Sequence, residues 1–180
     1  MRRYKIYILF FLLVLSDFLL STCEKQEYDL FPLNVGNEFY YTYKKDDLFA
    51  NTRGTVRWKV ISVSSQGHSN TYTIERKLTG TIETGGGIII ISDSLNFFEI
   101  SENKSSLLSS SSIVRYTEIT FERYQQNPEF EINHKSEGTQ DVSWNCLFKA
   151  DSGLTKYSYY HPPNSWCRES LHLDSLKIYR

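Results

Sequence analysis

The residues of this chain best suited to covalent chemistry are two late cysteines, Cys146 and Cys167, and the histidine between them, His161. An imidazole that takes the proton from a thiol makes the sulfur a nucleophile, and a carboxylate such as Asp151 can orient that imidazole. These residues support one interpretation of the chain, as a hydrolase with a Cys/His site. A disulfide between the two cysteines would abolish that site.

The same cysteines also have a structural interpretation. Cys146 falls in an alternating segment that predicts a strand, and Cys167 follows the turn Pro162-Pro163-Asn164 after the next predicted strand. In an oxidising compartment such a pair is expected to bridge. A closed loop of about 20 residues would then constrain the unfolded chain by ~3 kcal/mol. We therefore expect a Cys146–Cys167 disulfide, with two buried free thiols as the alternative.

Metal and cofactor chemistry are not indicated. The four histidines (His68, His134, His161 and His172) stand far apart, whereas structural zinc takes ligands in close pairs. Gly85-Gly86-Gly87 lacks the Lys and the Ser or Thr of a phosphate-binding loop and precedes an apolar run, so it predicts a hairpin turn. We expect no metal, no cofactor and no catalytic residue.

The aromatic side chains are the best candidates for a binding surface. They make up 15% of the chain, with 13 Tyr and 11 Phe, and they cluster in an early and a late segment. Stacked aromatic faces can bind a glycan or a lipid. The candidates are Tyr41, Tyr43, Tyr157, Tyr159 and Trp166. The alternative is that these residues serve only as good strand formers with one apolar and one polar end.

The elements that must position these side chains are strands. Apolar and polar residues alternate in Val56–Val60, Tyr72–Leu78 and Val142–Phe148, and turn residues separate such segments. We find no stretch of clean helical periodicity between them. The pattern predicts an all-β fold, an antiparallel meander of nine or ten strands that forms a curved sheet or a barrel. A two-sheet sandwich is the alternative.

Ile88–Ile91 resists the alternating pattern, because four isoleucines follow one another after the glycine turn. A run of this kind must be buried on both faces, or else it becomes a site of aggregation.

Length and charge limit the function classes. A chain of 180 residues corresponds to one domain. Lys plus Arg number 20 and Asp plus Glu number 21, for a net charge of −1. Proteins that bind nucleic acid normally carry a basic excess, so we expect no nucleic-acid partner.

The first residues have the order of a secretory signal. Arg2, Arg3 and Lys5 are followed by the apolar run Ile6–Leu15, and small polar residues come after it. The run is shorter than the ~20 residues that a membrane-spanning helix needs, and the charge of Asp17 separates it from the next apolar residues. An uncleaved signal anchor is therefore disfavoured.

The end of this signal resembles a bacterial lipobox, because Leu20-Ser21-Thr22 stands directly before Cys23. Thr22 occupies the place where Gly, Ala or Ser is usual. The resemblance implies cleavage before Cys23 and acylation of this residue, so that the mature chain is held in a membrane by its acyl chains. It implies a location in the cell envelope, at the outer membrane. The alternative is an ordinary secretory signal in which Cys23 is incidental.

Two further segments resemble small uncharacterised bacterial lipoproteins, which begin with a Phe-Pro-Leu-x-Val-Gly-Asn-x-Trp-x-Tyr pattern. Residues 31–41 match it, with Phe39 in place of Trp, and Gly153-Leu154-Thr155-Lys156-Tyr157 is similar to a late segment of the same group. The resemblance covers roughly a fifth of the mature chain and implies no activity.

Together these observations predict a signal peptide (residues 1–22), a lipidated Cys23 with a tether (residues 23–30) and a single β domain (residues 31–180). We expect a non-catalytic binding or interaction module for an apolar or glycan ligand, or for an envelope partner. The alternative is the Cys/His hydrolase of the envelope.

Overall fold

The computed structural model describes residues 26–103, 106–109, 119–135, 142–161 and 167–179. All regular elements in this part of the chain are strands. They are β1 (Tyr28–Asp29), β2 (Glu38–Asp47), β3 (Ala50–Gln66), β4 (Ser69–Thr84), β5 (Gly87–Asn103), β6 (Ser106–Ser109), β7 (Ile119–Glu122), β8 (Tyr124–Gln125), β9 (Glu129–Lys135), β10 (Ser143–Lys149), β11 (Gly153–His161) and β12 (Cys167–Lys177).

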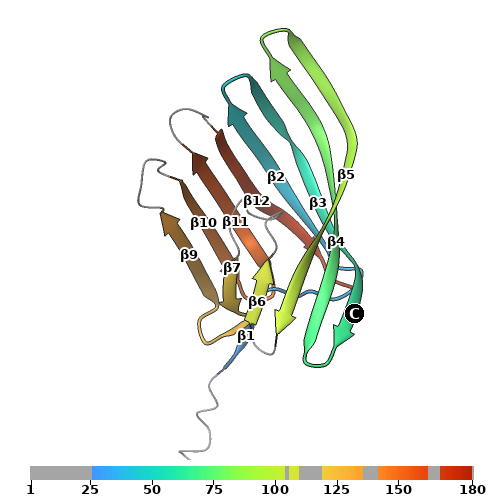
Figure 1. Cartoon of the computed structure of the whole chain (residues 1–180), viewed down its shortest axis with the longest axis vertical. Coiled ribbons are helices and arrows are strands. Elements are labelled where there is room, and N and C mark those ends of the chain that lie inside the picture. The colour runs from blue at the N-terminus through green and yellow to red at the C-terminus, as the bar shows by residue number, and fades with distance from the viewer. Residues whose placement is uncertain (1–25, 104–105, 110–118, 136–141, 162–166, 180) are drawn as a thin grey trace, which may run out of the picture.

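Ten of these strands form one antiparallel sheet in the order β7-β6-β5-β4-β3-β2-β12-β11-β10-β9 (Figure 1). Two meanders, β2 to β7 and β9 to β12, join where β2 pairs with β12 in the middle of the sheet. The predicted all-β meander is confirmed. The sheet is open, so it is a curved sheet and not a barrel, and it is continuous, unlike the two sheets of a sandwich.

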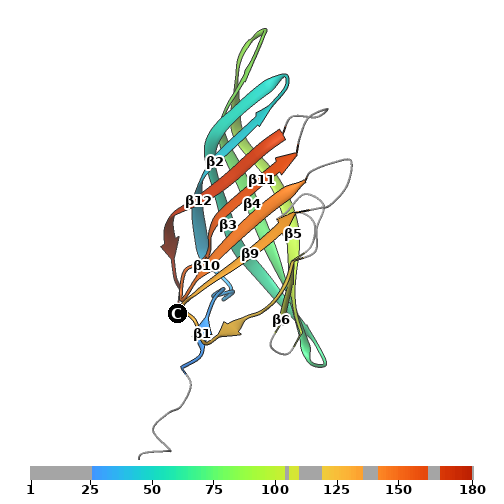
Figure 2. The same ribbon diagram turned by 90° about the vertical axis from the view of Figure 1, so that its left-hand side faces the viewer.

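The sheet is strongly curved (Figure 2), and β-bulges in its strands account for the curvature. Register shifts occur between Val60 and Ser62, between Leu78 and Gly80, and between Leu173 and Ser175. Each extra residue bends its strand and increases the local twist. Gly54 and Gly80 are paired across β3 and β4, and a Cβ on either one would collide with the backbone of the other strand.

The curvature brings the two ends of the sheet face to face. The ring of Phe121 in β7 lies 4.4 Å from that of Phe148 in β10 and 6.0 Å from that of Phe130 in β9, centroid to centroid. β7 and β9 therefore contact each other through side chains, although the sheet order does not pair them.

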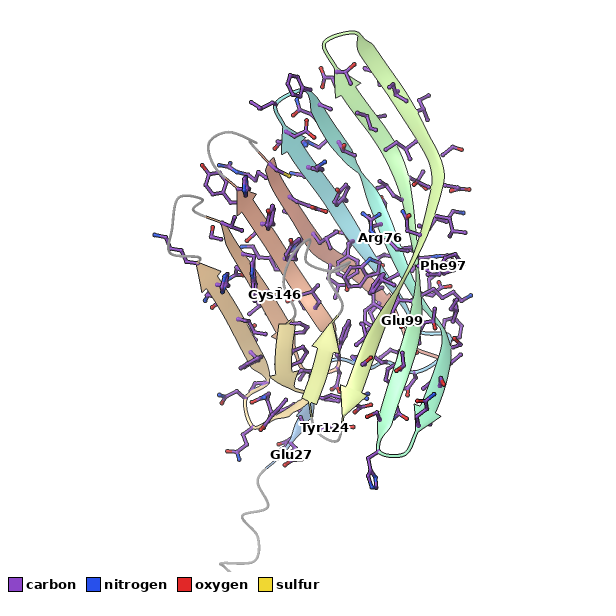
Figure 3. All side chains as sticks on the ribbon, viewed as in Figure 1. Glu27, Arg76, Phe97, Glu99, Tyr124 and Cys146 are labelled. Carbon is purple, nitrogen blue, oxygen red and sulfur yellow. The ribbon has the colours of Figure 1, made fainter. Side chains whose placement is uncertain are left out.

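The fold includes Tyr28–Leu30, a segment that was predicted from the sequence to belong to the tether. β1 pairs with β8, and Leu30 is fully buried. Figure 3 shows Glu27 and Tyr124 at the end of the molecule where the described chain begins. The hairpin turns β2–β3 and β4–β5 lie at the opposite end (Figure 1).

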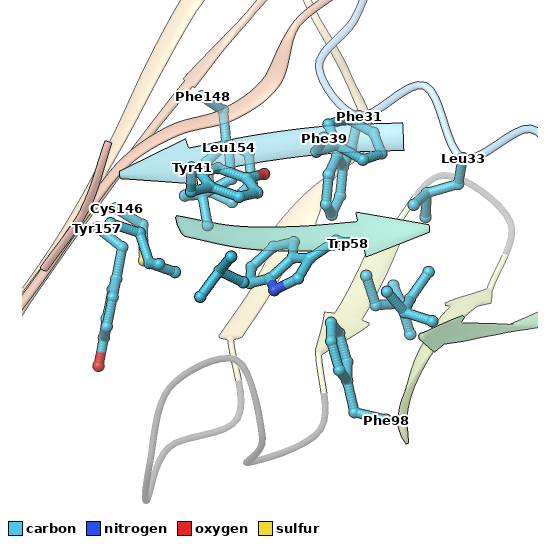
Figure 4. Packing of buried hydrophobic residues seen from close by; sticks show 14 of the residues in the cluster. Phe31, Leu33, Phe39, Tyr41, Trp58, Phe98, Cys146, Phe148, Leu154 and Tyr157 are labelled. Carbon is cyan, nitrogen blue, oxygen red and sulfur yellow. The ribbon is translucent and has the colours of Figure 1, made fainter. Parts of the chain in front are cut away.

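The two segments that resemble bacterial lipoproteins meet in the core (Figure 4). The ring of Phe31 lies 5.4 Å from that of Phe39, and a Cβ on Gly153 would collide with Phe31. Gly153 also has a φ of +77°, which favours glycine. Asn37 is buried and donates from its side chain to the carbonyl of Pro32 at 2.8 Å. Packing in the core and a buried hydrogen bond therefore explain why Phe, Gly and Asn stand at these positions.

Candidate ligand-binding trough

A trough with a volume of about 450 Å³ lies on the concave face of the sheet, across β12, β2, β3, β4 and β5. Cross-strand register places its side chains on one face. Tyr43 is opposite Leu171, Trp58 is opposite Arg76, and Arg76 is opposite Asn96. The lining residues are Tyr43, Lys45, Thr52, Trp58, Arg76, Leu78, Ile82, Ile91, Asn96, Phe97, Phe98, Glu169 and Leu171.

Charged side chains occupy one part of this trough. Lys45 and Glu169 are cross-strand partners, and the Nζ of Lys45 lies 3.2 Å from a carboxylate oxygen of Asp47. The guanidinium of Arg76 lies 5.4 Å from the centroid of the Tyr43 ring. Figure 3 shows Arg76 and Phe97 on the adjoining strands β4 and β5. Asp47 and Glu169 therefore lie beside Lys45, whereas Arg76 has no ion pair within the described residues and is the cation placed to meet an anionic group.

Aliphatic side chains occupy the other part. Ile82 and Ile91 are half-buried, and Leu78 is buried between them and the middle of the sheet. The trough therefore has the charged Glu169 and Lys45 on β12 and β2, the charged Arg76 on β4, and the aliphatic Ile82 and Ile91 nearer the turn that joins β4 to β5. A volume of this size lies within the usual range for small-molecule sites, about 300–1,000 Å³.

Three of the four aromatic residues that line the trough are buried, and the fourth, Phe97, is 57% exposed. Tyr43, Trp58 and Phe98 are each at most 5% exposed. Trp58 packs on Phe98 with 5.2 Å between ring centroids, and no hydrogen-bond partner for its indole N–H is found in the described chain. A ligand in the trough would therefore touch the aliphatic and charged side chains more than the aromatic faces.

A second hollow of about 740 Å³ lies near the ends of β9–β12. Its lining includes Trp144, Tyr159, Tyr160 and Arg168. His134 stacks on Trp144 at 5.3 Å, and the Arg168 guanidinium lies 5.6 Å from the Tyr160 ring centroid. Residues 136–141 and 162–166 are outside the described chain.

The predicted aromatic site does not form one surface. Tyr43 lines the trough and Tyr159 lines the second hollow, but Tyr41 and Tyr157 are 0% and 1% exposed. Their hydroxyls have no hydrogen-bond partner within the described residues, and burial raises the pKa of both. Trp166 lies outside the described residues, as does Cys23.

The expected Cys146–Cys167 disulfide is not formed. Cys146 is a free, buried thiol, and the pairing of β10, β11 and β12 keeps the two cysteines apart. Cys146 is opposite Tyr157, and Tyr157 is opposite Leu171, which stands four residues beyond Cys167. Strand spacing and rise then place the two cysteines roughly 16 Å apart, whereas a bridge needs Cα atoms within about 7 Å. Spacing in the sequence did not reveal this offset along β12.

The Cys/His site is partly assembled. His161 and Cys167 are direct cross-strand partners on β11 and β12. Asp151 lies in the turn before β11, at the other end of that strand, so it does not orient His161. Among the described residues, no group of three His, Cys, Asp or Glu side chains could hold a metal ion.

Sequence reasoning missed the residues that give the trough its chemistry: Lys45, Arg76, Ile82 and Glu169. Each is an ordinary member of an alternating strand, and only the pairing of five strands brings them together. The signal available was weak. Arg76 and Lys45 stand on the otherwise apolar phase of their strands, in line with Ile74 and Tyr43.

No protein-family model matches the chain, and no curated protein matches it. The chain is similar to two solved structures. One is described as a "putative lipoprotein" from Parabacteroides distasonis, with 11% identity and a TM-score of 0.47. The other is a "putative exported protein with YmcC-like fold" from Bacteroides fragilis, with 7% identity and a TM-score of 0.49. Each likeness covers 84% of this chain and 100% of the other.

No helix in the described part of the chain has the length and apolar character to cross a membrane.

Proposed function

We propose that this protein is a lipid-anchored, non-catalytic binding module of the cell envelope whose trough holds a small amphipathic ligand with an apolar chain and an anionic group. The observation that carries the proposal is the mixed lining of the trough, in which the aliphatic Ile82 and Ile91 accompany the cations Lys45 and Arg76. A glycan is the weaker candidate, because Tyr43, Trp58 and Phe98 are buried and Phe97 is the one exposed aromatic side chain in the lining on which a sugar could stack.

Binding is tested with a fluorescent fatty acid, 11-(dansylamino)undecanoic acid, and the purified full chain. We expect saturable binding that unlabelled dodecanoate displaces and that maltotetraose does not. Arg76→Gln should weaken the affinity for the carboxylate probe about tenfold, because it removes a charged partner worth ~1.4 kcal/mol. The same substitution should change the affinity for dodecanol, which is uncharged, much less, as displacement of the probe reports.

The matched control is Arg53→Gln, an exposed arginine that pairs with Asp46 away from the trough. This variant should bind the probe as the wild type does. An absence of saturable binding, or equal loss in Arg53→Gln and Arg76→Gln, would contradict the trough as the site. Displacement by maltotetraose and not by dodecanoate would mean that the ligand is a glycan and not an amphipathic molecule.

The anchor is tested by the intact mass of the protein from a bacterial membrane fraction. A mass of residues 23–180 plus acyl chains supports the lipid anchor that the lipobox-like segment implies. Cys23→Ala should leave the unprocessed chain without acyl chains, whereas Cys167→Ala should be processed normally. An unacylated wild-type chain cut near residue 23 would instead mean a secreted domain.

The Cys/His hydrolase is a second candidate, favoured by the cross-strand pairing of His161 with Cys167. An iodoacetamide probe would label Cys167 in the native protein, and the rate would be followed against pH. A labelling rate that stays high below pH 7 and falls in His161→Ala would support the hydrolase. Equal rates in the wild type and His161→Ala would remove it.

A further inference from the structure

Three of the four isoleucines in the run Ile88–Ile91 are exposed. Ile88, Ile89 and Ile90 are 70%, 57% and 78% exposed, near the turn of the β4–β5 hairpin. Ile88 and Ile90 lie on the convex face, and Ile89 lies on the concave face, since it is opposite Ile82 of the trough. Of the two outcomes that the sequence left open, burial on both faces is therefore excluded, and the exposed run is a surface at which chains could associate.

The same residues lie on an edge of the sheet. β5 pairs with β6 only through Ile100–Asn103, so in the described chain Gly87–Phe98 has a strand partner on the β4 side alone. An edge of this kind presents backbone N–H and C=O groups that can pair with another strand.

Half of this edge carries features that prevent pairing, and half does not. Ser92 and Asp93 stand opposite the single residue Thr79, and Asp93 has a φ of +59°. This bulge is held by Lys77, whose Nζ lies 2.9 Å from Asp93. Bulges and charges are the usual protection of an edge strand. Gly87–Ile91 has no bulge, charge or proline.

Alternation in the hairpin shows which backbone groups are available. The turn Gly85-Gly86 joins Thr84 to Gly87, and the pair that flanks a two-residue turn exchanges its hydrogen bonds. Ile89, two residues on, therefore directs its N–H and C=O toward β4. Ile88 and Ile90 direct theirs to the open edge.

We propose that Gly87–Ile91 is a self-association edge, at which a second copy of this chain adds its own β5 in antiparallel orientation about a two-fold axis at Ile89. Ile88 of each copy then pairs with Ile90 of the other copy. In each pair, the backbone N–H of either residue donates to the C=O of its partner. Ile89 of one copy stands opposite Ile89 of the other copy, and these two residues form a non-hydrogen-bonded pair. All three isoleucines gain an apolar cross-strand neighbour.

Charge and shape favour a second copy as the occupant. In this register Asp93 of one copy falls opposite Gly85 of the other, so no carboxylate meets a carboxylate and no side chain obstructs the bulge. The interface is short, below the ~800 Å² per partner of a stable complex. We therefore expect a reversible dimer. Figure 1 shows β1 at the end of the molecule opposite the β4–β5 turn, so in an antiparallel dimer the β1 ends point away from each other, and the anchors of the proposed function would enter two opposed membrane surfaces.

The test is disulfide trapping in the purified full chain. Cα atoms of a non-hydrogen-bonded pair lie about 4.5 Å apart, within reach of a disulfide. Ile89→Cys should form a covalent dimer under mild oxidation, at least ~10-fold more than Phe49→Cys. Phe49 is 83% exposed at the neighbouring β2–β3 turn and controls for accessibility. The wild type controls for the native cysteines.

A second measurement uses sedimentation velocity over a concentration series. The wild type should dimerise reversibly, and Ile90→Lys should weaken the dimer at least ~10-fold, because a charge in place of an exposed isoleucine opposes pairing without touching the core. Phe49→Lys should dimerise like the wild type. Equal trapping of Ile89→Cys and Phe49→Cys, or a wild type monomeric at all concentrations, would overturn the proposal.

Discussion

Asp29 and Arg123, 94 residues apart in the chain, form a bidentate salt bridge that links β1 to the segment between β7 and β8. The Nε and one terminal nitrogen of Arg123 each lie 3.0 Å from a different carboxylate oxygen of Asp29. The other terminal nitrogen of Arg123 lies 3.0 Å from the carboxylate of Glu102 on β5. One arginine thus joins the start of the fold to two parts of the sheet.

Arg123→Ala should therefore destabilise the protein by about 3–5 kcal/mol, since it leaves Glu102 buried without a cation. Burial opposes the charge of Arg123, but hydrogen bonds and charge from Asp29 outweigh it and raise the pKa of the guanidinium. Urea unfolding followed by tryptophan fluorescence measures the change. Arg53→Ala, which breaks an exposed pair with Asp46, should cost at most about 1 kcal/mol. Similar losses in both variants would contradict a structural role for the Arg123 cluster.

Gly80→Ala should cost about 1–3 kcal/mol, because a Cβ at Gly80 would collide with the backbone of Arg53 and Gly54 and force β3 and β4 apart. The same unfolding assay applies. Gly85→Ala is the matched control, since a Cβ there has open space around it. If Gly80→Ala is as stable as Gly85→Ala, the close approach of the two strands is not maintained in solution.

The all-β meander was predictable because alternation is a local property of each strand. Val56, Trp58 and Val60 alternate in the sequence, and all three are buried on the concave face. The central pairing of β2 with β12 was not predictable in this way. It joins residues such as Tyr43 and Leu171, which are far apart in the chain and carry no pairing signal of their own.

The trough was unpredictable for the same reason, because five strands contribute to it. Of the aromatic residues singled out from the sequence, Tyr43 lines the trough and Tyr159 lines the second hollow, whereas Tyr41 and Tyr157 are buried. Composition reveals that a side chain is aromatic, but only the curvature of the sheet decides whether that side chain is covered.

The Cys146 thiol should be almost inert in the native protein, because burial raises its pKa to about 12. With an ordinary thiol pKa near 8.5, the thiolate fraction at pH 8 would be on the order of 10³ times larger. In a Cys23→Ser/Cys167→Ser variant, iodoacetamide should therefore modify Cys146 on unfolding only, as the intact mass reports. Phe49→Cys with Cys146→Ser controls for an accessible thiol. Rapid labelling of native Cys146 would show that its strand opens.

The stability of the fold should fall in acid through Glu38. This carboxylate accepts a hydrogen bond from the Tyr40 hydroxyl at 2.5 Å, and Lys59 and Arg57 lie 3.4 and 4.0 Å away. The Tyr40 hydrogen bond is the largest cause, and with the two cations it outweighs the opposing effect of burial, so the pKa of Glu38 is lowered from 4.5. A lowered pKa in the folded state means that the contribution to stability is complete above about pH 4.5. It is lost as the pH falls through the folded-state value.

Urea midpoints measured from pH 7 to pH 3 test this dependence. The wild type should lose more stability below pH 4.5 than Glu38→Gln, which cannot titrate at this position but keeps the shape of the side chain. Glu83→Gln, an exposed change on β4, should follow the wild-type curve. Parallel curves for the wild type and Glu38→Gln would mean that the Glu38 cluster with Tyr40 and Lys59 is not formed in solution, since a carboxylate held by these groups has to give the protein a steeper loss of stability in acid.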